Sequence, residues 1–370
     1  MEIAGYPVRR LRARIAEGID PPLLAIALAL SVLGLAVLYS ASYGNAARVA
    51  NQLTNLAVAL AAMWAVAQVS PQRLARLALP AYAAGLALLV AVALGGDVVS
   101  GARRWLNLGI VRFQPSEMMK IAAPMMLAWY FHRREGAIRL RDFAAAGLLL
   151  ALPVALILRQ PDLGTATLVA AAGFYVIFFA GIGWKVLASL GVLALASAVP
   201  LWGLLHEYQR RRILTLLDPS QDPLGAGYHT IQSTIAVGSG GLAGKGWLNG
   251  SQTHLEFIPE RHTDFIFAVY AEEFGLLGNI VLLALYALLI ARGLAIAAQA
   301  ATLFARLLAG AITLVFFTYA FVNMGMVSGI LPVVGVPLPF ISYGGTAMAT
   351  LFLGIGILMG IHRHRKLVQT

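Results

Sequence analysis

The sequence predicts an all-α polytopic membrane protein of about ten transmembrane helices. Hydrophobic residues make up 60% of the 370 residues, charged residues only 12%, and the mean hydropathy is +0.80. Soluble domains average about 25% charged residues, so a soluble enzyme is excluded. One long hydrophilic stretch, residues 206–263, predicts a large extracytoplasmic loop between helices 7 and 8. We therefore expect a single integral membrane domain, residues 1–370, that contains this loop.

Ten apolar segments approach the length of about 20 residues that an α-helix needs to cross a bilayer. The predicted spans are residues 22–40, 50–69, 77–95, 116–131, 143–158, 164–182, 184–205, 265–291, 303–327 and 343–361. The termini and the loops on their side carry 16 Lys and Arg residues, whereas the opposite short loops carry five. The positive-inside rule therefore predicts that both termini are cytoplasmic and that residues 206–263 lie outside.

The charge and the cysteine count narrow the expected partners. The formal net charge is +11, but most basic residues lie in short cytoplasmic loops, where topology and anionic lipid explain them. We therefore expect no nucleic-acid partner. The chain has no cysteine, so packing against helices has to order the external loop in place of disulfides.

Asp264 stands at the mouth of a predicted membrane helix, directly before the apolar run 265–269. A charged group near the centre of a membrane helix costs about 2.5–3.5 kcal/mol, so its retention indicates a function. A second interpretation stays open, because Thr263 or Asp264 also suits the N-cap of the helix. Further along, Glu272 and Glu273 are expected to pair with Lys, Arg or polar groups in the bundle interior.

Lys120 lies about one turn inside the fourth predicted span, where an unpaired ammonium is costly. Pro115 and Ser116 are typical of a helix start, and Glu117 lies on the same helix face as Lys120. We expect Lys120 to approach Asp264 or another carboxylate. Proximity to Asp264 would lower the pKa of that residue.

Two loops and a glycine-rich stretch complete the predicted external face. Residues 160–165 and 331–345 contain prolines and glycines at membrane level, which favours either stiff turns or re-entrant segments that contact a substrate. Residues 238–246 are similar to a phosphate-binding loop, but Ser239 and Gly246 stand where that motif needs Gly and Ser or Thr. We interpret the stretch as flexible backbone that can approach a ligand closely.

Histidines and carboxylates gather near the end of the long loop. These residues, His254, Glu256, Glu260, His262 and Asp264, match no zinc spacing such as H-E-x-x-H. A divalent cation, Mg²⁺ or Mn²⁺, that bridges a carboxylate and a phosphate stays open. The sequence therefore leaves the metal content of the site unknown.

Five motifs along the chain are distinctive in combination. They are Gly-Ala-Arg103-Arg-Trp105, Gln-Pro-Ser-Glu117-Met-Met-Lys120, Gln-Pro-Asp162-Leu-Gly-Thr-Ala, the loop from Gly225 to Glu260-Arg-His262-Thr-Asp264-Phe-Ile-Phe, and Pro337-Leu-Pro-Phe-Ile-Ser342-Tyr-Gly-Gly345. Over nearly the whole chain they resemble the SEDS family of bacterial cell-wall polymerases. Gln160-Pro-Asp162 and the run after His262 look more like the RodA branch, which serves elongation, than the FtsW division branch.

The resemblance implies a ten-helix polymerase that joins lipid II units into glycan strands at the outer face of the bacterial cytoplasmic membrane. It also implies that a class B penicillin-binding protein, the transpeptidase, docks through its transmembrane helix, and that other elongation-complex proteins take part. In the family, the position of Asp264 is taken as essential for polymerisation. The residues predicted to bind the substrate are Lys120, Glu117, Arg103, Trp105, Asp162, Arg210, His262 and Ser342.

One carboxylate suits the chemistry that the resemblance implies. Lipid II already carries a pyrophosphate leaving group on the sugar C1, whereas a glycosidase needs a second carboxylate to protonate a poor leaving oxygen. Asp264 would take the proton of the acceptor 4-hydroxyl as that oxygen attacks C1 with inversion and undecaprenyl pyrophosphate leaves. Arg103, Lys120 and the cluster at Arg210 would meet the charge on the pyrophosphate.

Two other functions, a lipid II flippase and a passive scaffold, also fit part of the sequence pattern. Many spans, helix prolines and intramembrane charges are also expected of a transporter, here a lipid II flippase. Against this, no paired half-repeat is visible and the polar residues gather on one face. A passive scaffold does not explain charges at membrane depth.

Small residues of the eighth and ninth spans predict where the transmembrane helix of the partner docks. They are Ala284, Ala287, Ala291, Gly310 and Ala311.

Overall fold

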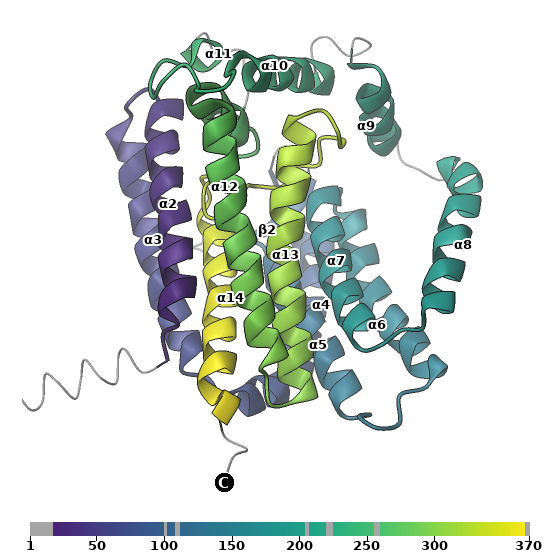
Figure 1. Ribbon diagram of the computed structural model, residues 1–370. Helices are drawn as coiled ribbons and strands as arrows, with labels where there is room; N and C mark the ends of the chain where they lie inside the picture. The colour runs from purple at the N-terminus through teal and green to yellow at the C-terminus, as the bar shows by residue number, and fades with distance from the viewer. Residues whose placement is uncertain are drawn as a thin grey trace, which may run out of the picture.

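The computed structural model describes residues 18–99, 102–107, 112–203, 207–219, 225–254 and 260–366. Most of these residues form helices that run side by side in a bundle (Figure 1). The long helices are α2 (Pro21–Ala41), α3 (Ala46–Ala67), α4 (Pro71–Gly95), α5 (Pro115–His132), α6 (Leu140–Arg159), α7 (Leu163–Phe179), α8 (Trp184–Trp202), α12 (Ile266–Ala298), α13 (Leu303–Val327) and α14 (Gly345–Arg363). Glu256 and the N-terminal arginines lie outside the described residues.

Seven described helices are long and apolar enough to cross a membrane, so the chain is a multi-pass membrane protein. They are α2, α3, α4, α6, α12, α13 and α14. The predicted spans at 116–131, 164–182 and 184–205 coincide with α5, α7 and α8. Length and composition alone do not identify these three as spans, because α5 carries Glu117 and Lys120 and the apolar parts of α7 and α8 are shorter.

Short elements cover one end of the bundle and link α4 to α5. Helices α10 (Ala226–Ser239) and α11 (Ser251–His254) lie across the end opposite to the one where α2 begins and α14 ends (Figure 1). Helix α9 (Glu207–Leu217) precedes them, and a short turn, η2 (His364–Lys366), follows α14. Strands β1 (Asp97–Val99), β2 (Ala102–Asn107) and β3 (Arg112–Phe113) form an antiparallel sheet in that order.

Helix starts follow local sequence signals. Asp20 accepts a hydrogen bond from the Leu23 N–H (3.0 Å) directly before the proline that opens α2, and Asp162 accepts one from the Thr165 N–H (3.0 Å) at the start of α7. Side-chain caps of this type satisfy backbone donors that have no partner within the helix. Asp162 therefore has a structural task as well as its predicted role in the site.

Helix α13 lies within the bundle and packs against α5, α7, α12 and α14. Gly310 and Ala311 of α13 are buried, and a Cβ atom at Gly310 would lie 2.8 Å from the Phe179 ring of α7. The prediction that these two residues form a lipid-facing docking surface is therefore wrong. The exposed small residues of that prediction all belong to α12: Ala284, Ala287 and Ala291.

Helix α8 stands apart from the other helices (Figure 1). Its large apolar side chains face outward, and Trp184 and Leu195 are each 78% exposed. An apolar surface of this kind suits contact with lipid tails.

Candidate active site

Asp264 lies in the turn formed by residues 260–265, which leads into α12. The helix begins at Ile266 with Phe265 as its N-cap, and no side chain caps it. The interpretation of Thr263 or Asp264 as a side-chain N-cap is therefore wrong. Among the described residues, no donor forms a hydrogen bond with the Asp264 carboxylate, so this carboxylate does not stabilise the fold through a hydrogen bond there.

Two buried polar side chains fix the backbone of this turn through hydrogen bonds. Asn323 of α13 donates to the carbonyl oxygens of Asp264 (2.8 Å) and Val336 (2.7 Å). The Ser342 hydroxyl donates to the carbonyl oxygen of Thr263 (2.7 Å). Ser342, predicted to bind substrate, therefore uses its hydroxyl to fix the backbone beside Asp264. Asn323 was not predicted, although a fully buried amide in an apolar span was the signal for it.

A polar cavity of about 430 Å³ opens beside Asp264. It brings together five of the predicted site residues from four parts of the chain: Asp264 before α12, Glu117 and Lys120 of α5, Asp162 before α7, and Trp105 of β2. Residues of the 331–345 loop, including Gly335 and Tyr343, close another side. We call this space the polar cavity.

Lys120 is buried and has two close partners. Its Nζ atom lies 2.6 Å from Oε1 of Glu117 and 2.6 Å from the hydroxyl oxygen of Tyr319 on α13. The prediction that Lys120 pairs with a carboxylate is confirmed, with Glu117 as the partner. The second oxygen of Glu117, Oε2, is buried and accepts no hydrogen bond from the described residues. Tyr319 was not predicted, because its hydroxyl gave no sign of which span it faces.

The pKa of Asp264 is raised to about 6, chiefly because burial disfavours the charged carboxylate, with the negative charge of Glu260 as the next cause. The carboxylate of Asp162 adds a smaller effect in the same direction. The predicted lowering of this pKa by Lys120 is wrong, since the ammonium of Lys120 is paired with Glu117. A raised pKa near the working pH is typical of a general base.

Two predicted arginines lie outside the lining of the polar cavity. Arg103 is exposed on β2, whereas the adjacent Arg104 lines the cavity and donates to the carbonyl oxygen of Pro161 (2.7 Å). Arg103 is therefore replaced by its neighbours on β2, since Arg104 and Trp105 both line the cavity. Arg210 of α9 donates to the carbonyl oxygen of Trp202 (3.0 Å) at the end of α8.

His262 also lies outside the lining and contacts Arg48 through its Nε2 atom. Burial and the positive charges of Arg48 and Arg261 lower the pKa of His262 to about 4. The imidazole is therefore neutral at pH 7. The backbone carbonyl of His262 accepts a hydrogen bond from the Tyr343 N–H (2.9 Å), which links the turn to the 331–345 loop.

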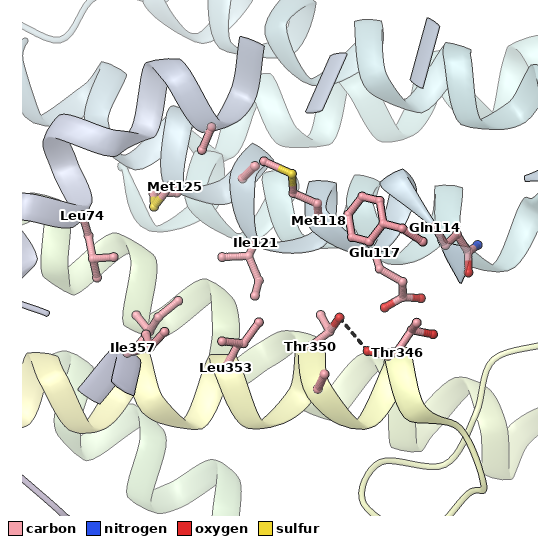
Figure 2. A pocket seen from close by; sticks show the side chains of 15 residues that line it. Leu74, Gln114, Glu117, Met118, Ile121, Met125, Thr346, Thr350, Leu353 and Ile357 are labelled. Carbon is pink, nitrogen blue, oxygen red and sulfur yellow. Dashed lines mark hydrogen bonds between the residues drawn. The ribbon is translucent and has the colours of Figure 1, made fainter. Parts of the chain in front are cut away.

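A second, apolar cavity of about 460 Å³ adjoins the polar cavity, and we call it the apolar groove. The two spaces share Gln114, Glu117 and Thr346 in their linings. Figure 2 shows the groove between α5 and α14, with Gln114 and Glu117 toward one end and Leu74 and Ile357 toward the other. A pocket lined by charged side chains thus lies beside a groove lined by apolar side chains.

The described residues hold no group of three or more His, Cys, Asp or Glu side chains arranged to bind a metal ion. Asp162 and Asp264 both line the polar cavity. A divalent cation there would need oxygen ligands from a bound phosphate as well. The Mg²⁺ or Mn²⁺ ion stays a prediction.

Comparison with known proteins places the chain among bacterial cell-cycle proteins. Residues 22–367 match the FtsW/RodA/SpoVE family, described as cell cycle proteins. The chain belongs to this family. It is 52% identical over 352 residues to peptidoglycan glycosyltransferase MrdB of Escherichia coli K12, with 95% of each chain covered. An FtsW of Geobacter metallireducens is 35% identical over 371 residues, with 96% of this chain and 98% of the relative covered.

Solved structures of family members share the fold. The chain superposes with a TM-score of 0.82 and 38% identity on a protein from a peptidoglycan synthase complex that coordinates polymerization and crosslinking, covering 94% of this chain and 98% of that one. It superposes with a TM-score of 0.71 and 32% identity on the rod shape determining protein RodA of Thermus thermophilus, covering 94% and 97%.

Proposed function

We propose that this family member is a peptidoglycan glycosyltransferase that joins lipid II units into glycan strands during cell elongation. The E. coli relative, peptidoglycan glycosyltransferase MrdB, is 52% identical over 95% of this chain, and the Geobacter metallireducens relative, a probable peptidoglycan glycosyltransferase FtsW, is 35% identical. The observation that carries the proposal is that the polar cavity and the apolar groove lie side by side and share Gln114, Glu117 and Thr346. A lipid-linked sugar needs both, because its pyrophosphate and its polyprenyl chain demand opposite surroundings.

Asp264 is the proposed general base. Its carboxylate lines the polar cavity and no described residue donates a hydrogen bond to it, so it is available to an incoming sugar hydroxyl. In the reaction the acceptor 4-hydroxyl oxygen bonds to C1 of the donor sugar, and its proton goes to Asp264. The bond from C1 to the pyrophosphate breaks with inversion, and undecaprenyl pyrophosphate leaves with the electron pair.

Cationic side chains of the polar cavity stabilise the leaving pyrophosphate in this proposal. Lys120 and Arg104 both line the cavity, and Arg104 takes the part that the sequence predicted for Arg103. Oε2 of Glu117, buried without a described donor, suits a substrate hydroxyl. A divalent cation shared by Asp162 and the pyrophosphate would add positive charge.

The apolar groove receives the undecaprenyl chain in this proposal. Its lining between α5 and α14 is almost entirely hydrocarbon, with Leu74, Met125 and Ile357 at the end away from Glu117 (Figure 2). Each buried CH₂ group contributes about 0.8 kcal/mol, so part of a long chain in this groove binds firmly. The pyrophosphate is then held beside Glu117, where the two cavities meet.

We further propose that α5, α7 and α8 complete a set of ten transmembrane helices in the bacterial cytoplasmic membrane, and that residues 1–370 form one domain. The described chain begins and ends at one end of the bundle, and the positive-inside rule assigns that end to the cytoplasm (Figure 1). The large loop that contains α9, α10 and α11 then lies outside, together with Asp264.

A class B penicillin-binding protein is the proposed partner. One solved structure that this chain resembles belongs to a peptidoglycan synthase complex that coordinates polymerization and crosslinking. The exposed face of α12 that carries Ala284, Ala287 and Ala291 suits close approach of a single transmembrane helix. Other elongation-complex proteins stay predicted partners.

The pH dependence of polymerisation follows from the pKa of Asp264, about 6. The base works only when ionised, so the rate is half its maximum near pH 6, approaches its maximum about one unit higher, and falls further as the pH drops. An ordinary aspartate, with a pKa of about 3.9, would keep the rate nearly constant down to about pH 5. Initial rates of glycan synthesis between pH 4.5 and 8 measure this, and a rate that stays constant from pH 8 down to pH 5 would contradict the raised pKa.

Glycan synthesis in detergent separates the polymerase from a lipid II flippase. Purified protein, with its partner, receives lipid II in micelles, where there are no two sides and transport has no meaning. We expect glycan chains longer than the substrate. Unchanged lipid II under conditions where the partner's transpeptidase domain is intact would contradict the proposed function.

A further inference from the structure

The external loop between α10 and α11 is inserted into a break in α12. Gly275 has φ 63° and ψ −159°, a conformation that a residue with a Cβ atom rarely adopts. At this break the backbone groups of the helix lose their partners within the helix. The loop supplies hydrogen-bond donors and acceptors in their place. The four backbone bonds, 2.9–3.0 Å long, run from Leu276 N to Gly241 O, from Leu277 N to Leu242 O, from Lys245 N to Glu272 O and from Gly246 N to Glu273 O.

The glycines of this loop allow backbone to meet backbone. A Cβ atom at Gly244 would lie 2.1 Å from the carbonyl oxygen of Glu273, a distance that no side chain can tolerate. The stretch 238–246, interpreted from sequence as flexible backbone near a ligand, instead approaches α12. Four hydrogen bonds at the break order this stretch, and we call residues 238–246 the wedge.

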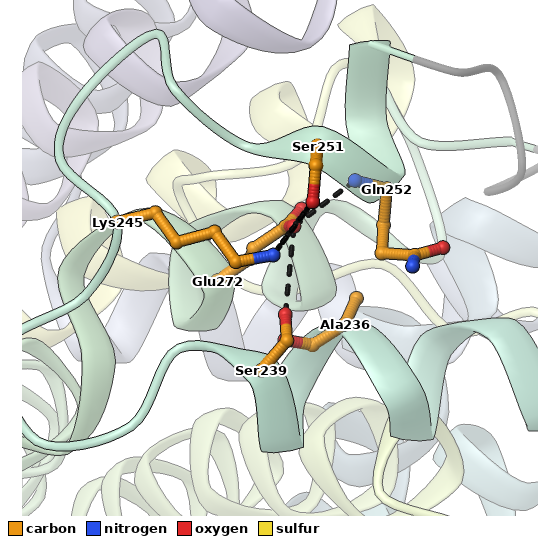
Figure 3. A network of polar contacts seen from close by, with 6 residues as sticks. All are labelled: Ala236, Ser239, Lys245, Ser251, Gln252 and Glu272. Atoms are coloured by element: carbon orange, nitrogen blue, oxygen red, sulfur yellow. Dashed lines mark hydrogen bonds and ion pairs between the residues drawn. The ribbon is translucent and has the colours of Figure 1, made fainter.

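A buried carboxylate fastens the wedge in place. Oε1 of Glu272 accepts hydrogen bonds from Lys245 Nζ (2.6 Å), Gln252 N (3.0 Å) and Ser251 Oγ (3.2 Å) (Figure 3). Glu272 is fully buried, and Lys245 also donates to Ser251 (2.7 Å). We call these four residues the Glu272 clasp. The expectation that Glu272 has a cationic partner is confirmed, but the predicted location of that partner in the bundle interior is wrong, because Lys245 belongs to the external loop.

The break makes residues 266–274 a short helix of their own, with Asp264 just before its start and Glu272 near its end. At about 1.5 Å per residue, the two carboxylates are about 12 Å apart along the axis. Asn323 and Ser342 hold the start of this short helix. The Glu272 clasp holds its end. The position of Asp264 therefore depends on both attachments.

The energetics of buried ion pairs suggest that the pair of Lys245 and Glu272 fixes the position of the short helix. Apolar residues of similar size often replace a buried pair without loss of stability, and in some proteins such a pair is retained because it fixes one arrangement of the chain. From these contacts we propose that Lys245 and Glu272 are positioning residues, whose ion pair ties the external loop to the short helix and so places the Asp264 carboxylate in the polar cavity. The inference rests on the proposed function of Asp264.

Substitution of the pair tests the inference through kcat, KM and the pH profile of polymerisation. Lys245→Met, Glu272→Gln and the double variant are each expected to lower kcat by about 10- to 100-fold, since a displacement near 1 Å has this effect. KM stays near the wild-type value, because neither residue lines the polar cavity. The double variant loses no more than the worse single variant, because the two side chains act as one unit. Lys245→Arg retains most of the rate.

The pH profile distinguishes repositioning from general damage. A displaced short helix admits water to Asp264, so the acid limb moves below that of the wild type, whereas partial unfolding lowers the rate at every pH equally. Arg292→Met is the matched control: Arg292 lies on the same helix, at its cytoplasmic end, and pairs with Asp20 through its Nε atom (3.1 Å). This control is expected to keep the wild-type kcat and acid limb.

Wild-type kcat and an unmoved acid limb in Lys245→Met and Glu272→Gln would overturn the inference. So would an equal loss in Arg292→Met. Should Glu272→Gln fail to elute as a single species, Lys245→Met decides alone, because its side chain is 29% exposed and its removal is tolerated more easily. Asp264→Asn is measured alongside: if it stays active, the proposed base is wrong, which is a separate result from an unmoved acid limb in the clasp variants.

Discussion

Asp264→Asn is expected to abolish glycan synthesis while the protein still folds and inserts into the membrane. Asparagine has the same shape but cannot accept a proton, and loss of a general base costs about 10²- to 10⁴-fold in rate. The carboxylate caps no helix and has no hydrogen-bond donor among the described residues, so folding loses little. Gel analysis of products from lipid II measures the first effect, and size-exclusion elution in detergent measures the second.

Glu260→Gln is the matched control for this variant. Glu260 is an exposed carboxylate in the same turn, and its charge raises the pKa of Asp264. Removing that charge lowers the pKa of Asp264, so the acid limb moves to lower pH while the rate at pH 7 stays near the wild-type value. Glycan synthesis by Asp264→Asn at a rate close to wild type would contradict the assignment of the base.

Lys120→Met is expected to lower both stability and activity. The substitution leaves Glu117 buried without its cationic partner, and breaking a buried pair in this way costs about 3–5 kcal/mol. It also removes a cation from the polar cavity, where charge develops on the leaving pyrophosphate. Thermal unfolding in detergent and initial rates of polymerisation measure the two losses separately.

The double variant Lys120→Met, Glu117→Gln separates stability from chemistry. With both charges gone, no unpaired ion is buried, so the unfolding temperature is expected to recover toward the wild-type value. Activity is expected to stay lost, because the cation for the pyrophosphate is still missing. Recovery of activity together with stability would show that Lys120 only stabilises the fold.

The sequence predicted those residues of the site whose charged side chains are costly to bury in a membrane. Lys120 inside an apolar span demanded a carboxylate, and Glu117 one turn earlier supplies it. Asp264 at the mouth of a membrane helix stood out for the same reason. These arguments need only the local sequence and the price of burying a charge, so they carried over to the structure.

Contacts between distant segments could not be predicted from local pattern. Tyr319 and Asn323 look like ordinary polar residues in an apolar helix until the fold brings them to Lys120 and to the backbone of Asp264. The choice between Arg103 and Arg104 depends on the direction in which β2 faces, which two adjacent arginines do not reveal.

The break in α12 was hidden for a related reason. The apolar pattern continues through Gly275, so the sequence indicates one unbroken span, and a single glycine is tolerated inside a helix at a cost of about 1 kcal/mol. Only the insertion of a loop some 30 residues earlier in the chain, with its own donors and acceptors, makes the interruption stable. Such a partner is visible only in the folded chain.

Binding of lipid II to Asp264→Asn, measured beside its polymerisation, tests the central claim most directly. If Asp264 acts as the base, the variant binds lipid II with a Kd close to that of the wild type and forms no glycan chain, because binding depends on the rest of the polar cavity and on the apolar groove. A loss of binding as large as the loss of activity, or continued chain formation, would contradict the account.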